Sequence, residues 1–423
     1  MQGEATPDDS SPTAVIDTTP PDAPQPSFAL RNPLFLRFWI AITLALTGLW
    51  VRITVQGYLV YELTEDPFLL GLVGFVNSIP TLLLSPVVGV VADRFERRRV
   101  LLVTQSVTAL ALLALGVLDA SGHLTVNHIL IISAIAGMAS AFDWPARLSI
   151  VPNLVKRHEM QSAVALNSAS FNGARILGPV IGGVLLGIIG TAACFFLAAG
   201  AFVPSLVVVA TLTIDRTLPT GKRESPLSNL VAGYRYIWNF PAVRSLLSVD
   251  LIPVMFGMSF FALLPAIAKD VYDGGSRQLG FLYAADGAGA VLGVLAVATL
   301  TSLRNRGRLV LIFVFAFSIL LMLFAISPNL WIGLIMIFLL GVSSALYGTL
   351  ADTLIQTLID DAFRGRVMAV YSTFWGMTPV GYLLAGTIAS QWNTQAAIFI
   401  NGMIVCVYVI ALTITNPGLR RLQ

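Results

Sequence analysis

Long apolar segments separated by short polar loops run through most of the chain. Each segment has about 20 residues, enough for a helix rising 1.5 Å per residue to cross a bilayer core of about 30 Å. Lipid offers no hydrogen-bond partner to free backbone groups, and the segments are too uniformly apolar for barrel strands, so we predict helices. The twelve predicted spans lie near residues 38–61, 68–92, 99–118, 127–147, 163–188, 191–213, 243–267, 279–300, 308–326, 330–350, 366–389 and 394–415.

The composition places these helices in a membrane. Of the 423 residues, 56% are hydrophobic and only 11% are charged, whereas soluble domains have roughly 25% charged residues. The mean hydropathy is +0.83. We therefore predict an all-α membrane protein. It would have a disordered tail (1–33), an N-terminal six-helix bundle (34–214), a central loop (215–242), a C-terminal six-helix bundle (243–416) and a short tail (417–423).

The positive charges indicate how the helices are oriented. If the loops alternate between two sides, 21 of the 25 Lys and Arg residues lie on the side of the termini. The other side has only Lys269 and Arg277, and Arg52 and Arg175 lie within spans. Positive loops resist translocation, so we predict that both termini are cytoplasmic. The absence of an N-x-[ST] sequence favours a bacterial inner membrane over other plasma membranes.

Few residues suit enzyme or metal chemistry. The two cysteines, Cys194 and Cys406, lie in apolar segments, and the three histidines do not form a ligand cluster. The chain lacks a phosphate-binding GxxxxGK[ST] loop, which argues against an ATP-driven machine. The net charge of +3 gives no reason to expect nucleic acid. We predict a monomer that needs no cofactor or metal and interacts with a small molecule, protons and lipid.

The two halves of the chain resemble each other. GVVADRFERRRVLLV at 89–103 has a counterpart 204 residues later, GVLAVATLTSLRNRG at 293–307. AVALNSASFNGARILGPVIGG at 163–183 matches VMAVYSTFWGMTPVGYLLAGT at 367–387 with the same offset. A duplicated six-helix unit is typical of transporters whose site lies between two pseudo-symmetric halves.

The first of these segments resembles the loop signature of the major facilitator superfamily. The matching residues are Gly89, Asp93, Arg94, Arg97 and Arg98. The family usually has glycine where this chain has Glu96, and Val297 replaces the aspartate in the second copy. The resemblance implies twelve transmembrane helices arranged as two pseudo-symmetric six-helix bundles.

Further motifs resemble the branch of that superfamily that includes the enterobactin exporter and macrolide-efflux permeases. They are LVYELT (59–64), FDWPAR (142–147), ALNSASFNGARILGPVIGG (165–183) and FRGRVMA (363–369). The third is similar to an antiporter signature in helix five. It keeps Gly178, Pro179, Gly182 and Gly183, with Ala165 and Ala174 in place of the first glycines. The arginine of helix four that the family associates with proton coupling is absent.

Two interpretations of the 89–99 loop remain open. The basic residues could simply anchor the loop on the cytoplasmic side. Alternatively, Gly89, Asp93, Arg94, Arg97 and Arg98 form a cytoplasmic gate, in which Asp93 caps or pairs with a neighbouring helix. The resemblance implies that this neighbour is helix eleven, which starts near residues 364–366.

Six charged residues lie in or near the predicted spans, on helices one, four, five, seven, eight and ten. Such residues usually face a cavity or a partner. Arg52, Asp250, Asp286 and Arg175 are our candidates for coupling or substrate binding, with Asp286 about 10 Å into helix eight. We expect Asp143 to form a structural ion pair with Arg147, and Asp352 is the sixth charge. Helices three, six, nine and twelve carry none, as expected for helices facing lipid.

Together these features predict a secondary transporter rather than an enzyme. We expect it to export a small amphipathic molecule, such as a siderophore, drug or metabolite, by proton antiport with rocker-switch alternating access. A lipid or lysophospholipid flippase, or an importer of the same fold, is the main alternative. A non-transporting membrane sensor is a further one.

Overall fold

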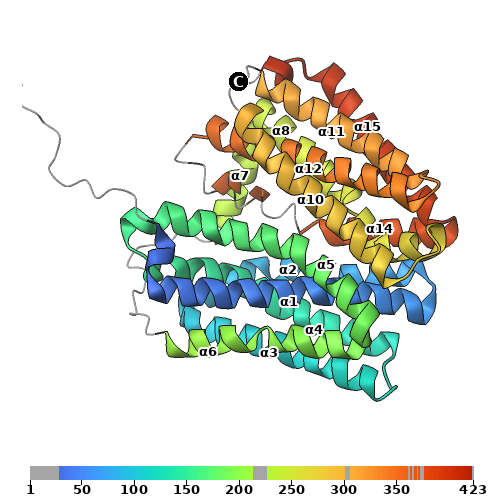
Figure 1. Ribbon diagram of the computed structural model, residues 1–423. Coiled ribbons are helices and arrows are strands. Elements are labelled where there is room, and N and C mark those ends of the chain that lie inside the picture. Colours follow the sequence, from blue (N-terminus) through green and yellow to red (C-terminus); the bar gives the residue numbers. More distant parts are fainter. Residues whose placement is uncertain are drawn as a thin grey trace, which may run out of the picture.

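A computed structural model describes residues 28–212, 226–300, 305–360, 363, 366–368, 370–371 and 376–421. All regular elements in these ranges are helices (Figure 1). Their arrangement confirms the predicted fold class. The longer helices are α1 (Pro33–Thr64), α2 (Pro67–Arg94), α3 (Arg97–Ala120), α4 (Val126–Leu154), α5 (Met160–Gly200), α6 (Val203–Thr211), α7 (Pro226–Asn239), α8 (Pro241–Ile252), α9 (Phe260–Ala266), α10 (Ser276–Leu300), α11 (Arg306–Ala325), α12 (Leu330–Leu358), α14 (Thr378–Gln391) and α15 (Thr394–Thr415).

Helices α1 to α6 form the first bundle, the lower one in Figure 1. The stretch 157–211 is far longer than one span needs. It reverses at Gly190, where φ is 77° and ψ is 176°. Residues with a side chain rarely adopt this conformation, so a glycine ends the fifth span and starts the sixth.

Helices α8 to α15 form the second bundle. Its first span is irregular, because α8 and α9 are joined by a π-helical turn (Pro253–Gly257) and a second such turn follows (Ile267–Val271). Pro253 and Pro265 lack the backbone N–H that a regular helix would use there, which accounts for part of this irregularity.

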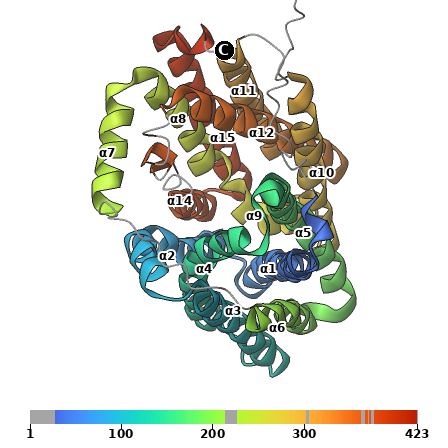
Figure 2. The same cartoon turned by 90° about the vertical axis from the view of Figure 1, so that its left-hand side faces the viewer.

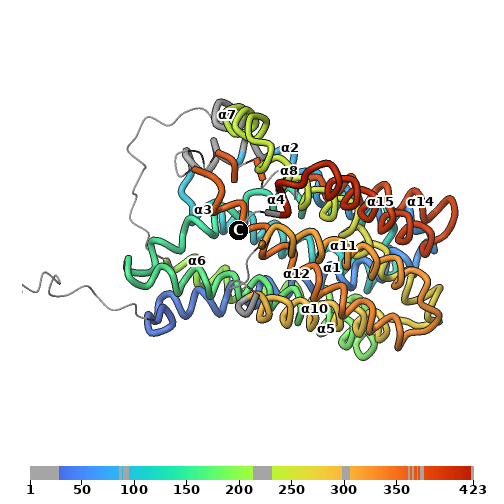
Figure 3. The backbone as a smooth tube through the Cα atoms, turned by 90° about the horizontal axis from the view of Figure 1, so that it is seen from above, coloured from blue at the N-terminus to red at the C-terminus, as the bar shows by residue number. Residues whose placement is uncertain are grey.

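Ten stretches of the described residues are long and apolar enough to cross a membrane. One of them, 157–211, contains two spans, and the segment predicted at 366–389 is only partly described and contains α14. The first helix begins and the last helix ends at the same end of the bundles (Figure 3). We call this end the terminal side and the opposite end the distal side.

The two bundles touch mainly through two helix pairs, α2 with α14 and α5 with α10. Each crossing contains a pair of glycines, Gly71 with Gly386 and Gly183 with Gly280. All four lie in the distal half of their helices. In Figure 1, α5 and α10 are close at their distal ends and diverge toward the terminal side. The bundles are therefore closed against each other on the distal side.

The outer helices of each bundle present apolar side chains to the surroundings. Helices α3 and α6 lie on the outside of the first bundle (Figure 2), and α11 and α15 run along the upper edge of the second bundle in Figure 1. Their exposed side chains include Leu110, Val207, Phe315 and Val407. Large exposed apolar side chains need lipid or another partner, but α1, α4, α5, α10 and α12 also expose such side chains, so the lipid-facing role of helices three, six, nine and twelve stays a prediction.

Two predicted boundaries differ from the structure. Residues 28–33 belong to the first bundle rather than to a tail, because the Ala29 amide donates to Ser162 Oγ and Asn32 Nδ2 donates to the Leu154 carbonyl. The predicted central loop contains helix α7. Its sequence buries Tyr236 and Ile237 on one side while Trp238 stays exposed, which stabilises a helix lying against the second bundle.

Candidate functional site

Arg175 of α5 and Asp286 of α10 face each other across the interface between the bundles. The charge of Arg175 acts on Asp286, yet the two do not form an ion pair. Neither side chain has a hydrogen bond to any described residue. Asp286 is 5% exposed, whereas Arg175 is half-buried. A buried charge without a direct partner is unfavourable in a membrane protein, so this pair is a candidate site for a ligand.

Close helix packing holds these two charges at the interface. Gly341 of α12 lies so near the Asp286 carbonyl that a β-carbon on Gly341 would be 2.1 Å from it. Gly287 lies against Ile176, where a β-carbon would come within 2.7 Å of the isoleucine side chain. Small residues at both crossings thus let α10 approach α12 on one side and α5 on the other.

Aromatic side chains lie beside Arg175 in the first bundle. Phe171 makes edge contacts with Trp50 at 6.2 Å and with Trp144 at 5.0 Å between ring centroids. The Trp50 Nε1 donor is buried and has no hydrogen-bond partner among the described residues. In the second bundle, Tyr283 donates to the Phe261 carbonyl at 3.3 Å. Aromatic faces with a few polar groups suit an amphipathic ligand.

Arg52 lies in the core of the first bundle, away from this pair. It donates to Gln56 Oε1 at 2.9 Å and to Asn77 Oδ1 at 3.5 Å. The two carboxamides donate in turn to Ser133, to its Oγ at 2.7 Å and to its carbonyl at 3.1 Å. This ring of contacts joins α1, α2 and α4. Neither Asp250 nor Asp286 is among the partners of Arg52 in this structure.

Asp250 and Asp352 lie together in the second bundle, joined by a tyrosine. Tyr371 Oη is 2.8 Å from Asp250 Oδ2 and 2.6 Å from Asp352 Oδ1. Asp250 is 3% exposed and Tyr371 is 8% exposed. Two of the six charges singled out in the sequence thus form one cluster, which connects α8, α12 and the start of the eleventh span.

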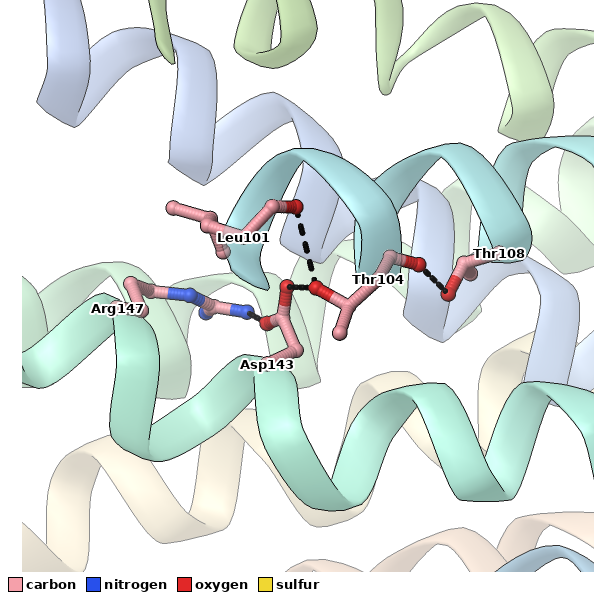
Figure 4. A network of polar contacts seen from close by, with 5 residues as sticks. All are labelled: Leu101, Thr104, Thr108, Asp143 and Arg147. Atoms are coloured by element: carbon pink, nitrogen blue, oxygen red, sulfur yellow. Dashed lines mark hydrogen bonds and ion pairs between the residues drawn. The ribbon is translucent and has the colours of Figure 1, made fainter. Parts of the chain in front are cut away.

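Asp143 and Arg147 form an ion pair on the terminal half of α4 (Figure 4). Their side chains are 14% and 7% exposed. Thr104 of α3 donates to Asp143 Oδ1 at 3.3 Å, and the guanidinium lies 5.5 Å from the centre of the Trp144 ring. The predicted ion pair is therefore present, and the contact of Asp143 with Thr104 ties α3 to α4.

The proposed gate residues are only partly described. The side chains of Asp93 and Arg94, which lie near the end of α2 together with Gly89, are outside the described residues. Arg97 Nη1 donates to the Ser149 carbonyl at 2.7 Å, and Arg98 Nε donates to the Val209 carbonyl at 3.0 Å. These two arginines bind carbonyl groups near the ends of α4 and α6. The gate stays a prediction.

The helix-five motif serves two different contacts. A β-carbon on Gly178 would be 2.3 Å from Trp50 Cβ, so this glycine lets α1 approach within the first bundle. A β-carbon on Gly183 would be 2.5 Å from Gly280 Cα, so this glycine lets the two bundles meet. Gly182 has ordinary contact distances of 3.4 Å, and Pro179 is buried between them.

Polar contacts reinforce the closure on the distal side. Tyr61 at the end of α1 donates a hydrogen bond to Asp270 of the second bundle. Lys269 Nζ lies 2.8 Å from Glu65 Oε1. The hydrogen bond from Lys269, together with its charge, holds the pKa of Glu65 below its ordinary value. Because a lowered pKa keeps a carboxyl charged, this contact is present at neutral pH and is lost only as the pH falls through that pKa.

Comparison with known proteins identifies the family. Residues 25–420 match the family described as transmembrane secretion effector. The chain belongs to this family. It is 26% identical over 382 residues to the multidrug efflux pump Tap of Mycolicibacterium fortuitum, covering 86% of this chain and 91% of Tap. It is 27% identical over 398 residues to the enterobactin exporter EntS of Escherichia coli O81 (strain ED1a), covering 93% of both chains.

Solved structures support the same fold. The nucleoside transporter NupG superposes with a TM-score of 0.70 at 14% identity, covering 92% of this chain and 100% of NupG. A bacterial homologue of the human lysosomal transporter Spinster, in an inward-facing and unoccupied conformation, gives 0.68 at 15% identity, covering 93% of this chain and 97% of that chain. The family match and the related efflux proteins make this protein a membrane transporter of the major facilitator superfamily and not an enzyme, as the sequence predicted.

Some residues that form the transporter's polar contacts were not predicted from the sequence. Tyr371 and Tyr61 look like ordinary aromatic residues in apolar segments, because their partners are distant in sequence. Asp270 had a weak signal, since it neighbours one of the two distal cations. Within the described parts of the chain, no group of three or more His, Cys, Asp or Glu residues could hold a metal ion.

We predict that the transporter's distal closure depends more on Tyr61 than on Glu65. Tyr61→Phe removes a hydrogen bond worth about 1 kcal/mol, which would lower the distal-closed population relative to the distal-open one about fivefold. Glu65→Gln should change this ratio about twofold or less, because Glu65 and Lys269 are exposed. The measurement is the distance between two spin labels attached to the cysteines of His123→Cys and Gln391→Cys. The native Cys194 and Cys406 are replaced in this protein so that they take up no label. Equal effects of the two substitutions would contradict the ranking.

Proposed function

We propose that this transporter exports a small amphipathic molecule from the cytoplasm in exchange for protons. The terminal side would face the cytoplasm, as the distribution of positive charge in the sequence favours. The related proteins named as a multidrug efflux pump and an enterobactin exporter support an export direction and an amphipathic cargo. Drugs, siderophores and related metabolites are the cargo classes we infer.

The observation that carries this proposal is the pair of unbonded opposite charges at the bundle interface. Asp286 belongs to one bundle and Arg175 to the other, so relative motion of the bundles changes their separation. A carboxyl group in such a position can bind a proton when the arginine moves away and release it when the arginine approaches. Proton release and cargo binding would then use the same place.

The packing of the bundles supports a rocker-switch cycle. The present conformation is closed on the distal side by the glycine crossings and by the Tyr61–Asp270 contact. Cargo would enter from the terminal side and lie between the aromatic group of Trp50, Phe171 and Trp144 and the charged pair. Rocking would then open the distal side, where cargo leaves and a proton binds Asp286. Ligand and proton act by stabilising different states of one equilibrium.

A vesicle experiment tests this proposal. Inside-out vesicles carrying the protein are given an acid interior, reported by a quenched dye, and candidate siderophores, macrolides and other amphipathic drugs are added. We expect substrate-dependent dequenching, which Asp286→Asn should reduce at least tenfold because the amide cannot carry the proton. The matched control is Asp273→Asn, since Asp273 is an exposed residue on the distal side.

The outcomes separate the proposal from its rivals. Dequenching that persists in Asp286→Asn would remove this residue from the coupling. No dequenching by any compound, with protein shown to be folded, would contradict proton-coupled export. The next test would then add lipid substrates, because a flippase has the same fold.

A further inference from the structure

The cluster of Asp250, Tyr371 and Asp352 contains two acidic groups on either side of one hydroxyl. The Tyr371 Oη lies within hydrogen-bond distance of both carboxyl groups, at 2.8 Å and 2.6 Å. The three side chains come from three different spans of the second bundle. Asp250 lies nine residues into α8 from Pro241, or about 13 Å along the helix from the terminal side.

Counting hydrogen atoms shows what this arrangement requires. A phenol has one hydroxyl hydrogen and can donate it to one acceptor, and an ionised carboxylate only accepts. If both aspartates were ionised, one of the two contacts would bring two oxygens together without a hydrogen between them. Both contacts are favourable only if one carboxyl group is protonated and donates to Tyr371 Oη, while Tyr371 donates to the other.

The charges around the cluster also favour one protonated carboxyl group. Among the described residues, Asp250 and Asp352 form no ion pair with Lys, Arg or His. The titratable groups nearby are Tyr347 of α12, which both aspartates influence, and Arg175 of α5, which acts on Tyr347. Tyr408 of α15 contacts Ser248 of α8. Two buried negative charges without a cation repel each other strongly, and a shared proton removes one of them.

We propose that Asp250, Tyr371 and Asp352 form a proton-binding site that holds one proton between two carboxyl groups. The site is separate from the Arg175–Asp286 pair, since it lies within the second bundle rather than between the bundles. Loss of its proton leaves two negative charges that push α8 away from α12, whereas binding of the proton draws the three spans together. The link to transport rests on the proposed proton antiport, but the proton itself can be observed without transport.

Infrared spectroscopy of the purified full-length protein tests the site. A protonated carboxyl group has a carbonyl stretching band distinct from that of a carboxylate, and the band shifts in D2O. We expect wild-type protein to show such a band that disappears as the pH is raised across the range in which the protein stays folded. Asp250→Asn and Asp352→Asn should each relieve the need for the proton, because the new amide can donate to Tyr371 Oη while the tyrosine donates to the remaining carboxylate.

The design separates this site from the proposed function. Asp286→Asn, which should reduce coupled transport at least tenfold, leaves the cluster intact and should keep the titrating band. A band lost in at least one of the two cluster variants, and kept in Asp286→Asn, supports the site. A band that is absent from wild type, or unchanged in both cluster variants, overturns it. Gel filtration of each variant, with Asp273→Asn as the reference, checks folding.

Transport then tests the role of the site. If the cluster carries a coupled proton, Asp352→Asn should lower proton-driven export at least tenfold while leaving exchange of labelled for unlabelled cargo within about twofold. Exchange does not need net proton movement, so it reports cargo binding and rocking alone. Equal loss of both activities would assign the cluster a structural role and would contradict its part in coupling.

Discussion

Asp143→Ala is expected to lower the free energy of unfolding by about 3 kcal/mol. The substitution removes the carboxylate that pairs with Arg147 in a site where both side chains are nearly buried. Arg147 Nε and Nη1 already have no hydrogen-bond partner among the described residues. Without Asp143, the guanidinium keeps only its contact with the Trp144 ring. An uncompensated buried charge is far more costly than the loss of an exposed ion pair.

The thermal unfolding midpoint of the detergent-purified protein measures this effect. The shift equals the loss divided by the entropy of unfolding, which grows with chain length, so in a chain of 423 residues the midpoint should fall by about 3–4 °C. The control is Glu96→Ala, which breaks the exposed contact between Glu96 and Arg99 and should change stability by about 0.5 kcal/mol or less. The double variant Asp143→Ala/Arg147→Met should recover most of the loss, because it removes both charges. If the double variant were no more stable than Asp143→Ala, the unpaired charge would not be the cause.

The hydropathy pattern predicted the membrane helices because lipid leaves few alternatives. An apolar segment of about 20 residues without backbone partners outside itself forms a helix, so the twelve segments follow from the pattern, whereas their arrangement as two six-helix bundles was implied by the internal repeat and the family resemblance. Helix formation in these segments does not depend on partners that are distant in the sequence. By contrast, the ordering of residues 28–33 and the helix α7 depend on contacts with Ser162, Leu154 and the second bundle, which lie far away in the sequence.

The candidate site was only partly predictable for the same reason. A charge in an apolar segment stands out in the sequence, which is how Asp250, Asp286, Arg175 and Asp352 were found. Their pairing is a property of the packing. Nothing local distinguishes Tyr371 from other aromatic residues, and only the fold places its hydroxyl between two carboxyl groups.

Gly183→Val is expected to have the largest effect on the closure of the distal side. A β-carbon at residue 183 would lie 2.5 Å from Gly280 Cα, 2.9 Å from its backbone nitrogen and 3.0 Å from the Ser276 carbonyl oxygen. All three are backbone atoms, so no side chain can rotate away and α10 must move. Overpacking of this kind costs about 1–3 kcal/mol, and here the cost falls on the distal-closed state alone. The ratio of closed to open molecules should drop by roughly 5- to 150-fold.

A series of alanine substitutions along α5 isolates this contact from general effects on the helix. Gly173→Ala meets nothing within 4 Å, and Gly182→Ala makes contacts at 3.4 Å, so both should transport at rates within about twofold of wild type. Gly183→Ala should show the same defect as valine in weaker form. The measurements are the transport rate in vesicles and the distance between the labels at His123→Cys and Gln391→Cys. The label distance should increase in the Gly183 variants only, because the glycine acts at the crossing of the two bundles. An equal decline in the transport rate of all these variants would instead mean that α5 tolerates no side chain at any of these glycines.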